Sequence, residues 1–189
     1  PKEITNSIGM KLVLIPKGTF MMGSPPDEID SLGGERRHEV TISRDYYMGA
    51  HEVTQAQYKK VMGKNPSYFQ GDQMKDVDSS NHPVEQVSWD WAVEFCQRLS
   101  ALPEEKKAGR VYRLPTEAQW EYACRAGSTT AYGCGNDDRS LGDHTWYRIN
   151  SQGQTHAVGQ KKPNAWGMHD MHGNVWEWCS HWYDAQYYT

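Results

Sequence analysis

Short apolar runs dominate the first fifty residues, and their period is that of β-strands. Four of them are predicted to be strands: residues 11–16, 19–22, 39–42 and 46–48. Pro16 ends the first run, and Lys17-Gly18 can form a turn, so we expect the first two strands to pair as a hairpin. Residues 23–34 are rich in Gly, Pro, Ser and Asp and predict a loop.

Three later segments change to the spacing of amphipathic helices. Each follows a residue whose side chain can cap a helix: Thr54, Ser88 and Thr116. Each is followed by a residue that ends a helix: Gly63, Pro103 and Gly127. Gln119 stands three residues after Thr116 and completes a capping box. These signals predict three short helices, the first over residues 55–62.

The remaining chain shows turn residues and aromatics without a helical or strand period. Residues 65–83 form a long irregular segment, and a loop of this length in a compact domain is usually functional or specially tied down. No long helix is predicted after Gly127. A chain of 189 residues is the size of one domain. We therefore expect a single, irregular, loop-rich α+β domain over residues 1–189.

Composition narrows the class of protein. The mean hydropathy is −0.85, yet 8 Trp and 11 Tyr are too many for a disordered chain. The net charge of −4 and the lack of long basic runs argue against nucleic-acid binding. No stretch of about 18 apolar residues is present, so no membrane span is predicted.

The cysteines form no redox or zinc motif. They are Cys96, Cys124, Cys134 and Cys179, and none belongs to a Cys-x-x-Cys pair. They could form two disulfides or remain buried free thiols, and the sequence does not pair them. No Ser/His/Asp or Cys/His triad can be assembled from their order along the chain, so no catalytic residue is predicted.

Two carboxylates flank a Gly-Asn turn near the end of the chain and predict a metal site. Asp170 and Glu177 are separated by Gly173 and Val175, whose carbonyls can turn inward. Two charged and two carbonyl oxygens suit Ca²⁺, which takes 6–8 oxygen ligands in a flexible geometry. Two alternatives stay open. In one, Glu177 only caps backbone N–H groups. In the other, softer donors bind Zn²⁺: His169, His172, Cys179 and His181.

Three groups of motifs resemble the formylglycine-generating enzyme family in order and spacing. They comprise residues 18–24 with 52–58, residues 83–92 with 113–123, and residues 163–178, which read PNAWGMHDMHGNVWEW. The resemblance implies a loop-rich variant of the C-type lectin-like fold. It also implies a structural Ca²⁺ held at Asp170, Gly173, Val175 and Glu177.

The activity that the resemblance implies is oxidation of a sulfatase cysteine to formylglycine with O₂. In that family a cysteine pair near the C-terminus binds Cu(I) after an Arg-Gly-Gly-Ser-Trp stretch. This sequence ends at Thr189 without that stretch. We therefore expect a domain that lacks its C-terminal segment, with copper bound only if that segment carries the pair. Cys96 and Cys124 match family positions that form disulfides to that segment.

The resemblance also suggests partners and a setting. The expected partner is a sulfatase polypeptide or another protein or peptide ligand, and the expected source is a bacterial cytoplasm or periplasm. The alternative is a non-catalytic ligand- or protein-binding module with the same lectin-like fold. The chain as given is expected to be inactive, because none of its cysteines stands at a catalytic position of the family.

Overall fold

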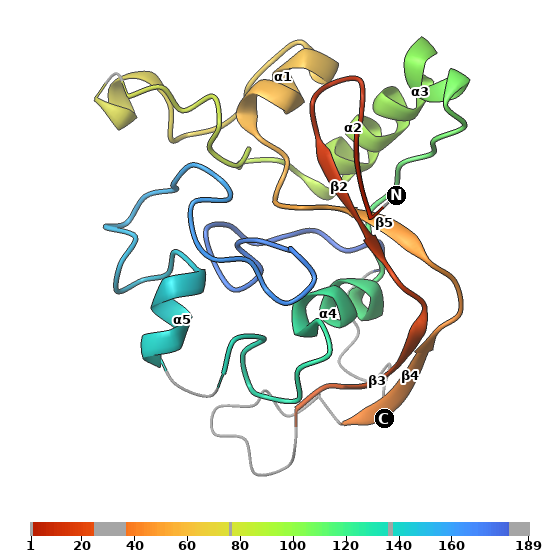
Figure 1. Cartoon of the computed structure of the whole chain (residues 1–189). Helices are drawn as coiled ribbons and strands as arrows, with labels where there is room; N and C mark the ends of the chain where they lie inside the picture. The colour runs from red at the N-terminus through yellow and green to blue at the C-terminus, as the bar shows by residue number, and fades with distance from the viewer. Residues whose placement is uncertain (1, 25–36, 76, 136–137, 182–189) are drawn as a thin grey trace.

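A computed structural model describes residues 2–24, 37–75, 77–135 and 138–181 of the chain. Most of the predicted 23–34 loop lies outside these residues. In Figure 1, short strands run down one side of the molecule, helices gather at two ends, and irregular C-terminal loops lie between them. No helix in the described ranges is both long and apolar enough to cross a membrane, as the sequence predicts.

The strands form two small antiparallel sheets. They are β1 (Glu3–Thr5), β2 (Lys11–Ile15), β3 (Gly18–Met22), β4 (His38–Ile42) and β5 (Tyr46–Gly49). The first sheet has the order β1-β2-β5, and the second pairs β3 with β4. All four predicted strands are present. β1 was not predicted, because three residues are too short for a period to show.

The predicted hairpin between the first two strands is wrong. β2 pairs with β5 and β3 pairs with β4, so the strands form one long ribbon with a bend in each arm. The bend in the first arm follows the Ile15–Tyr46 pair and falls at Pro16, which has no N–H to donate to a ladder. Beside it the Lys17 amide donates to Asp45 Oδ1 at 2.8 Å. Pro16 and Lys17-Gly18 therefore bend a continuing strand instead of reversing it.

The three predicted helices begin at their predicted caps. They are α1 (Gln55–Met62), α2 (Trp89–Ala101) and α4 (Glu117–Arg125). The Thr116 hydroxyl accepts from the Gln119 backbone amide at 3.1 Å, and the Gln119 side-chain oxygen accepts from the Thr116 backbone amide at 3.1 Å. Thr54 and Gln57 form the same reciprocal box at the start of α1. These bonds satisfy helix N–H groups that have no partner within the helix.

Three short elements were not predicted: η1 (Gly71–Met74), α3 (Pro103–Lys107) and α5 (Asp138–His144). Pro103 follows the end of α2, as expected, but it is also the first residue of α3. Proline is favoured there because its fixed φ suits a helix and its missing N–H is not needed.

The irregular segment 65–83 is tied down by one buried side chain. The Gln55 amide nitrogen donates to Phe69 O at 3.0 Å. Its oxygen accepts from Asn65 Nδ2 and from Ser79 Oγ, both at 2.9 Å. Gln55 thus joins three separate points of the segment, and bonds from Gln70 and Glu85 add to them, as a segment without regular backbone pairing requires.

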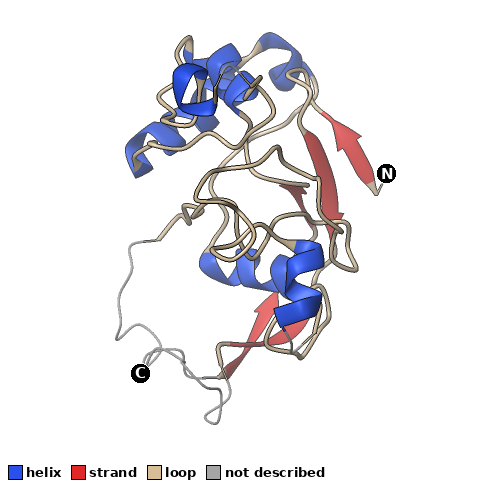
Figure 2. Ribbon diagram, turned by 90° about the vertical axis from the view of Figure 1, so that its left-hand side faces the viewer, coloured by secondary structure: helices blue, strands red, loops and turns tan. Residues whose placement is uncertain are grey.

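Two apolar clusters lie on either side of β2, because successive residues of a strand point to opposite faces. One cluster joins Val13 and Ile15 to α4 and the C-terminal loops, through Tyr122 and Met168. The other joins Leu12 to α1 and α2. Figure 2 shows one group of helices at the top of the molecule and a second group lower down, beside the strands. The irregular loops that carry the last motif are held between these clusters.

Candidate metal centre

Residues 170–175 form tight turns in which position 173 has no room for a side chain. The Gly173 amide donates to Asp170 O at 3.1 Å, and the Val175 amide donates to Gly173 O at 2.9 Å. A Cβ atom on Gly173 would lie 2.1 Å from Trp146 O and 2.5 Å from Thr145 Oγ1. The turn therefore packs directly on the backbone of Trp146 and the side chain of Thr145.

Asn174 fastens this turn to the preceding loop. The Asn174 backbone N–H donates to Trp146 O at 2.7 Å. Its side chain accepts from His156 N at 3.0 Å and donates to His156 O at 3.1 Å. Asn174 has a φ of +65°, in the left-handed region that asparagine tolerates better than most residues. The sequence analysis identified the Gly-Asn turn but not this role of Asn174.

Asp170 is buried, with only 2% of its surface exposed. Its Oδ2 accepts from the Gly159 amide at 2.7 Å, while Oδ1 has no hydrogen-bond partner among the residues that the structure describes. Burial raises the pKa of this carboxyl, and the Gly159 bond and nearby His169 oppose the rise. A buried carboxylate with one unsatisfied oxygen is costly unless a cation neutralises it.

Glu177 shares this electrostatic environment. Burial raises its pKa to about 7; the Trp120 indole nearby opposes the rise, and the negative charge of Asp170 adds to it. The two predicted carboxylates thus act on each other across the turn. Val175 and Glu177 both line the same cavity, and Asp170 is not part of its lining.

A third carboxylate, Glu52, belongs to the same region. It is buried, and neither carboxyl oxygen makes a hydrogen bond of full geometry. Burial raises its pKa well above the ordinary value, and the charges of Glu177 and Asp170 raise it further. The His169 amide donates to Ala50 O at 2.8 Å and holds the chain before Glu52 beside the last motif. Glu52 lies in a recognised motif, but its spacing gave no sign of this proximity.

The donor chemistry of this region fits a hard cation. Asp170 and Glu177 supply carboxylates whose pKa values burial raises, and Gly173 and Val175 supply carbonyls in the same stretch of chain. No group of three His, Cys, Asp or Glu side chains in the described ranges converges closely enough to hold a metal. A cation here would therefore need backbone carbonyls in addition to the two carboxylates, which is common for Ca²⁺.

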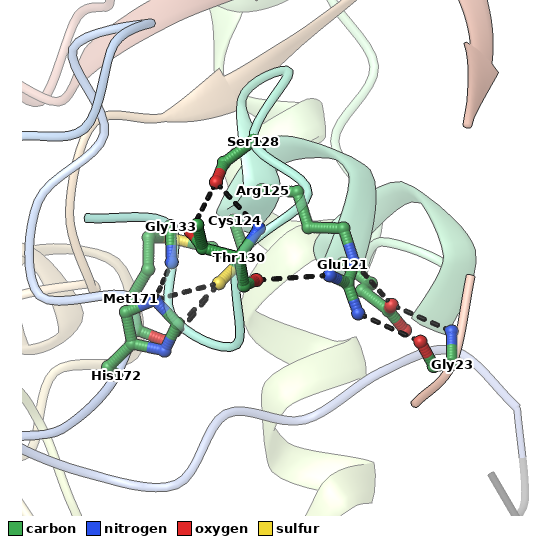
Figure 3. Close-up of polar contacts among 9 residues, drawn as sticks. All are labelled: Gly23, Glu121, Cys124, Arg125, Ser128, Thr130, Gly133, Met171 and His172. Carbon is green, nitrogen blue, oxygen red and sulfur yellow. Dashed lines mark hydrogen bonds and ion pairs between the residues drawn. The ribbon is translucent and has the colours of Figure 1, made fainter. Parts of the chain in front are cut away.

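The softer donors do not come together as a zinc site would require. His169 Nδ1 lies 2.9 Å from Lys161 O, whereas the His172 ring accepts from the Gly133 amide at 3.0 Å. Figure 3 shows His172 beside Cys124, with Nε2 3.6 Å from the sulfur. Across the described residues no such set could hold a metal, so the zinc interpretation is not supported.

The cysteines are also unsuited to Cu(I). None of the four is part of a disulfide in the described part of the chain. Burial raises the pKa of Cys96 to about 11, that of Cys124 to about 12 and that of Cys179 to about 11. These thiols are protonated at neutral pH, and Cu(I) is bound by thiolates. The cysteines of this chain do not fit a copper site.

Comparisons with known proteins agree with the sequence analysis. A family model described as "Sulfatase-modifying factor enzyme 1-like domain" matches residues 2–189. Chaperone protein LppX of Paenibacillus barcinonensis is 35% identical over 76% of this chain and 64% of its own. The formylglycine-generating enzyme of Mus musculus is 29% identical over 94% of this chain and 59% of its own. The chain thus spans about six-tenths of the length of these two relatives.

A solved structure, Treponema denticola variable protein 1, superposes with a TM-score of 0.82 at 30% identity. The match covers 97% of this chain and 78% of that one. It confirms the predicted fold class, a mixed α+β domain with few regular elements.

Proposed function

Because this chain belongs to the sulfatase-modifying factor family, we propose that its parent protein oxidises a sulfatase cysteine to formylglycine with O₂ and copper. The family match over residues 2–189 carries this proposal, together with the similarity to a protein named formylglycine-generating enzyme. The residues described here supply the scaffold of that reaction. Copper would have to be held by cysteines outside the present sequence, since those within it do not fit.

The scaffold role predicts that this chain is inactive by itself. Incubated with Cu(I), O₂ and a peptide carrying a sulfatase cysteine motif, it is expected to yield no formylglycine, because its thiols are dispersed and protonated. Mass spectrometry of the peptide measures the product, and a complete formylglycine-generating enzyme serves as the positive control. Copper-dependent turnover by residues 1–189 would contradict this assignment of roles.

Within the scaffold, we propose that Ca²⁺ binds at Asp170 and Glu177, with the Gly173 and Val175 carbonyls. The support is a pair of carboxylates, the buried Asp170 with one unsatisfied oxygen and the half-buried Glu177 with its pKa raised to about 7. Bound Ca²⁺ would neutralise both and stiffen the turn. This role is structural and stands apart from any redox chemistry.

Calcium is therefore expected to raise the melting temperature. At a Ca²⁺ concentration 100-fold above Kd the gain is about 2.7 kcal/mol, roughly 5–10 °C for a protein of this size. Scanning calorimetry in millimolar Ca²⁺ and in chelator measures it. Glu177→Gln should abolish the shift, and Glu39→Gln, at an exposed position on β4, should keep it. An unchanged melting temperature in the unsubstituted chain would remove the calcium proposal.

A second candidate function is a non-catalytic binding module. Two observations favour it: relatives of this chain include proteins named as a chaperone and as a variable protein, and Trp176 and Trp178 are exposed. Exposed Trp side chains are enriched where proteins bind one another. Assays of formylglycine formation and of ligand binding with the full-length parent protein distinguish the two candidate functions. Formylglycine formation supports the first, and ligand binding without turnover supports the second.

A further inference from the structure

The irregular segment 65–83 carries an open cleft that takes no part in the proposed oxidation or in the calcium site. Its volume is about 620 Å³, and it is lined by Pro66, Ser67, Tyr68, Gln70, Asp72, Gln73 and Gln86. Figure 1 shows η1, in yellow, at an outer corner of the molecule, apart from α4. Because long loops in compact domains are usually functional, this cleft is a candidate for the function of the segment.

Hydrogen bonds join the two stretches of chain that form the cleft. Glu85 Oε1 accepts from the Phe69 amide at 2.9 Å, and the Glu85 amide donates to Ser67 Oγ at 3.2 Å. The Gln70 side chain donates to Ser67 O at 2.6 Å and accepts from Asn65 Nδ2 at 2.8 Å. The backbone of the cleft is therefore already ordered, and a ligand would not have to offset the entropy of ordering it.

Several side chains of the cleft are not used by the fold. Those of Asp72, Gln73 and Gln86 are exposed and make no hydrogen bond with any residue that the structure describes. Tyr68 is 54% exposed, and its ring is held edge-on by Phe69, with the ring centroids 5.2 Å apart. The cleft therefore presents a supported aromatic ring beside polar groups whose hydrogen-bonding capacity is free, as ligand sites do.

Gln86 adopts a backbone conformation that its side chain disfavours. Its φ is +60°, in the left-handed region where glycine is the default residue. Its exposed side chain makes no contact in the described structure that would offset this cost. Residues in such strained conformations cluster at ligand-binding sites. The strain therefore points to a role of the Gln86 side chain outside the fold itself.

The composition of the lining indicates the chemical class of the ligand. Its described residues include one acid, Asp72, and no basic side chain, which argues against phosphates and other anions. Only Pro66 and Tyr68 offer apolar surface, so an apolar ligand would find few contacts. A side-chain amide has two donors and one acceptor group, and a hydroxyl both donates and accepts, so the two match each other. The C–H face of a sugar ring can in addition lie against an aromatic ring such as Tyr68.

We propose that this cleft binds a neutral oligosaccharide. One sugar ring lies against Tyr68, and its hydroxyls form hydrogen bonds with the side chains of Gln73 and Gln86. The Asp72 carboxylate accepts from a further hydroxyl. Because the cleft is open and the bonds are few, the dissociation constant is expected to be roughly 0.1–10 mM. The inference does not depend on the proposed oxidation or on calcium, since the cleft shares no residue with the proposed metal centre.

The first test titrates the isotopically labelled chain with cellopentaose, mannopentaose and maltopentaose and follows the backbone amides by NMR. At least one of these sugars should shift amides of residues 66–73 and 85–86. Tyr68→Ala should weaken binding at least about five-fold without changing the melting temperature. Trp176→Ala, which removes an exposed aromatic outside the cleft, should leave binding unchanged. Absence of shifts with all three sugars at about 20 mM, or binding that Tyr68→Ala leaves intact, would overturn the proposal.

The second test separates binding from stability at Gln86. Gln86→Gly should raise the melting temperature by roughly 2–4 °C, because it relieves the left-handed backbone, and should weaken sugar binding about five-fold. The matched control is Lys75→Gly. Lys75 also has a left-handed φ, of +49°, but does not line the cleft, so its replacement should stabilise the chain and leave binding unchanged. A Gln86→Gly variant that binds the sugar as tightly as the unsubstituted chain would contradict the assignment. Binding of neutral peptides in the cleft, with no binding of the sugars, would also contradict it and would identify a peptide site.

Discussion

Replacing Gly173 with alanine is expected to lower the free energy of unfolding by about 3 kcal/mol or more. The new Cβ would lie 2.1 Å from Trp146 O and 2.5 Å from Thr145 Oγ1. Most of this contact is with backbone, which cannot rotate away, so either the turn or residues 145–146 must shift. The midpoint of urea unfolding measures the loss.

The matched control is Gly167→Ala in the same motif. Gly167 has a φ of +87°, and a Cβ there would meet nothing within 4 Å. That substitution carries only the strain of a left-handed alanine, about 1 kcal/mol. A loss at Gly173 no larger than that at Gly167 would show that residues 145–146 do not enforce the glycine. A larger loss together with a weaker calcium shift would tie the turn to the metal centre.

Glu105→Gln is also expected to lower the free energy of unfolding strongly, because Glu105 is fully buried and joins three parts of the chain. Its Oε1 accepts from the Ser7 amide at 2.7 Å, and its Oε2 accepts from Tyr112 Oη at 2.6 Å. Arg110 Nη1 lies 3.2 Å from Oε2. Removing the charge leaves Arg110 without its partner and weakens both other bonds, with a loss of about 3 kcal/mol.

The pH dependence of unfolding tests whether the negative charge of Glu105 accounts for this loss of stability. Burial alone would raise the pKa of Glu105, but the bonds from Ser7, Tyr112 and Arg110 outweigh it and lower the pKa to about 2. A carboxyl with a lowered folded-state pKa stabilises the protein above its unfolded value near 4.5, and this stabilisation is lost as the pH falls towards 2. Between pH 7 and pH 3, the stability difference between the unsubstituted chain and Glu105→Gln should therefore shrink.

Glu104→Gln is the control for this prediction, since Glu104 is the exposed neighbour of Glu105 on α3. It should change stability by less than about 0.5 kcal/mol at either pH. Urea unfolding at pH 7 and at pH 3 measures all three proteins. A Glu105→Gln variant as stable as Glu104→Gln at pH 7 would refute the role of Glu105 as a link between segments.

The local signals in the sequence predicted local structure well. Thr54, Ser88 and Thr116 each cap a helix, because a cap depends on residues three positions apart. The family motifs led to the fold, whereas the metal site at Asp170 and Glu177 stays a prediction. Gly173 has no room for a Cβ atom because the Trp146 backbone and the Thr145 hydroxyl pack against it, which the sequence does not show.

The failures have one physical origin, which is contact between residues distant in sequence. Pro16 and Gly18 predicted a reversal, but β2 finds its partner in β5, beyond another pair of strands. Glu52 is near Asp170 and Glu177 only because the chain returns to it after more than half its length. Neither period nor composition contains such information, and it becomes visible only when the chain is folded.

The contact between Ala50 and His169 has a consequence for folding kinetics. Closing so long a loop costs more entropy than pairing β2 to β5 with one another. The paired strands should therefore form first, and the region of Glu52, Asp170 and Glu177 should form late. Contacts absent from the transition state affect mainly the unfolding rate. A cation bound at Asp170 and Glu177 would then lower the unfolding rate and leave the folding rate nearly unchanged.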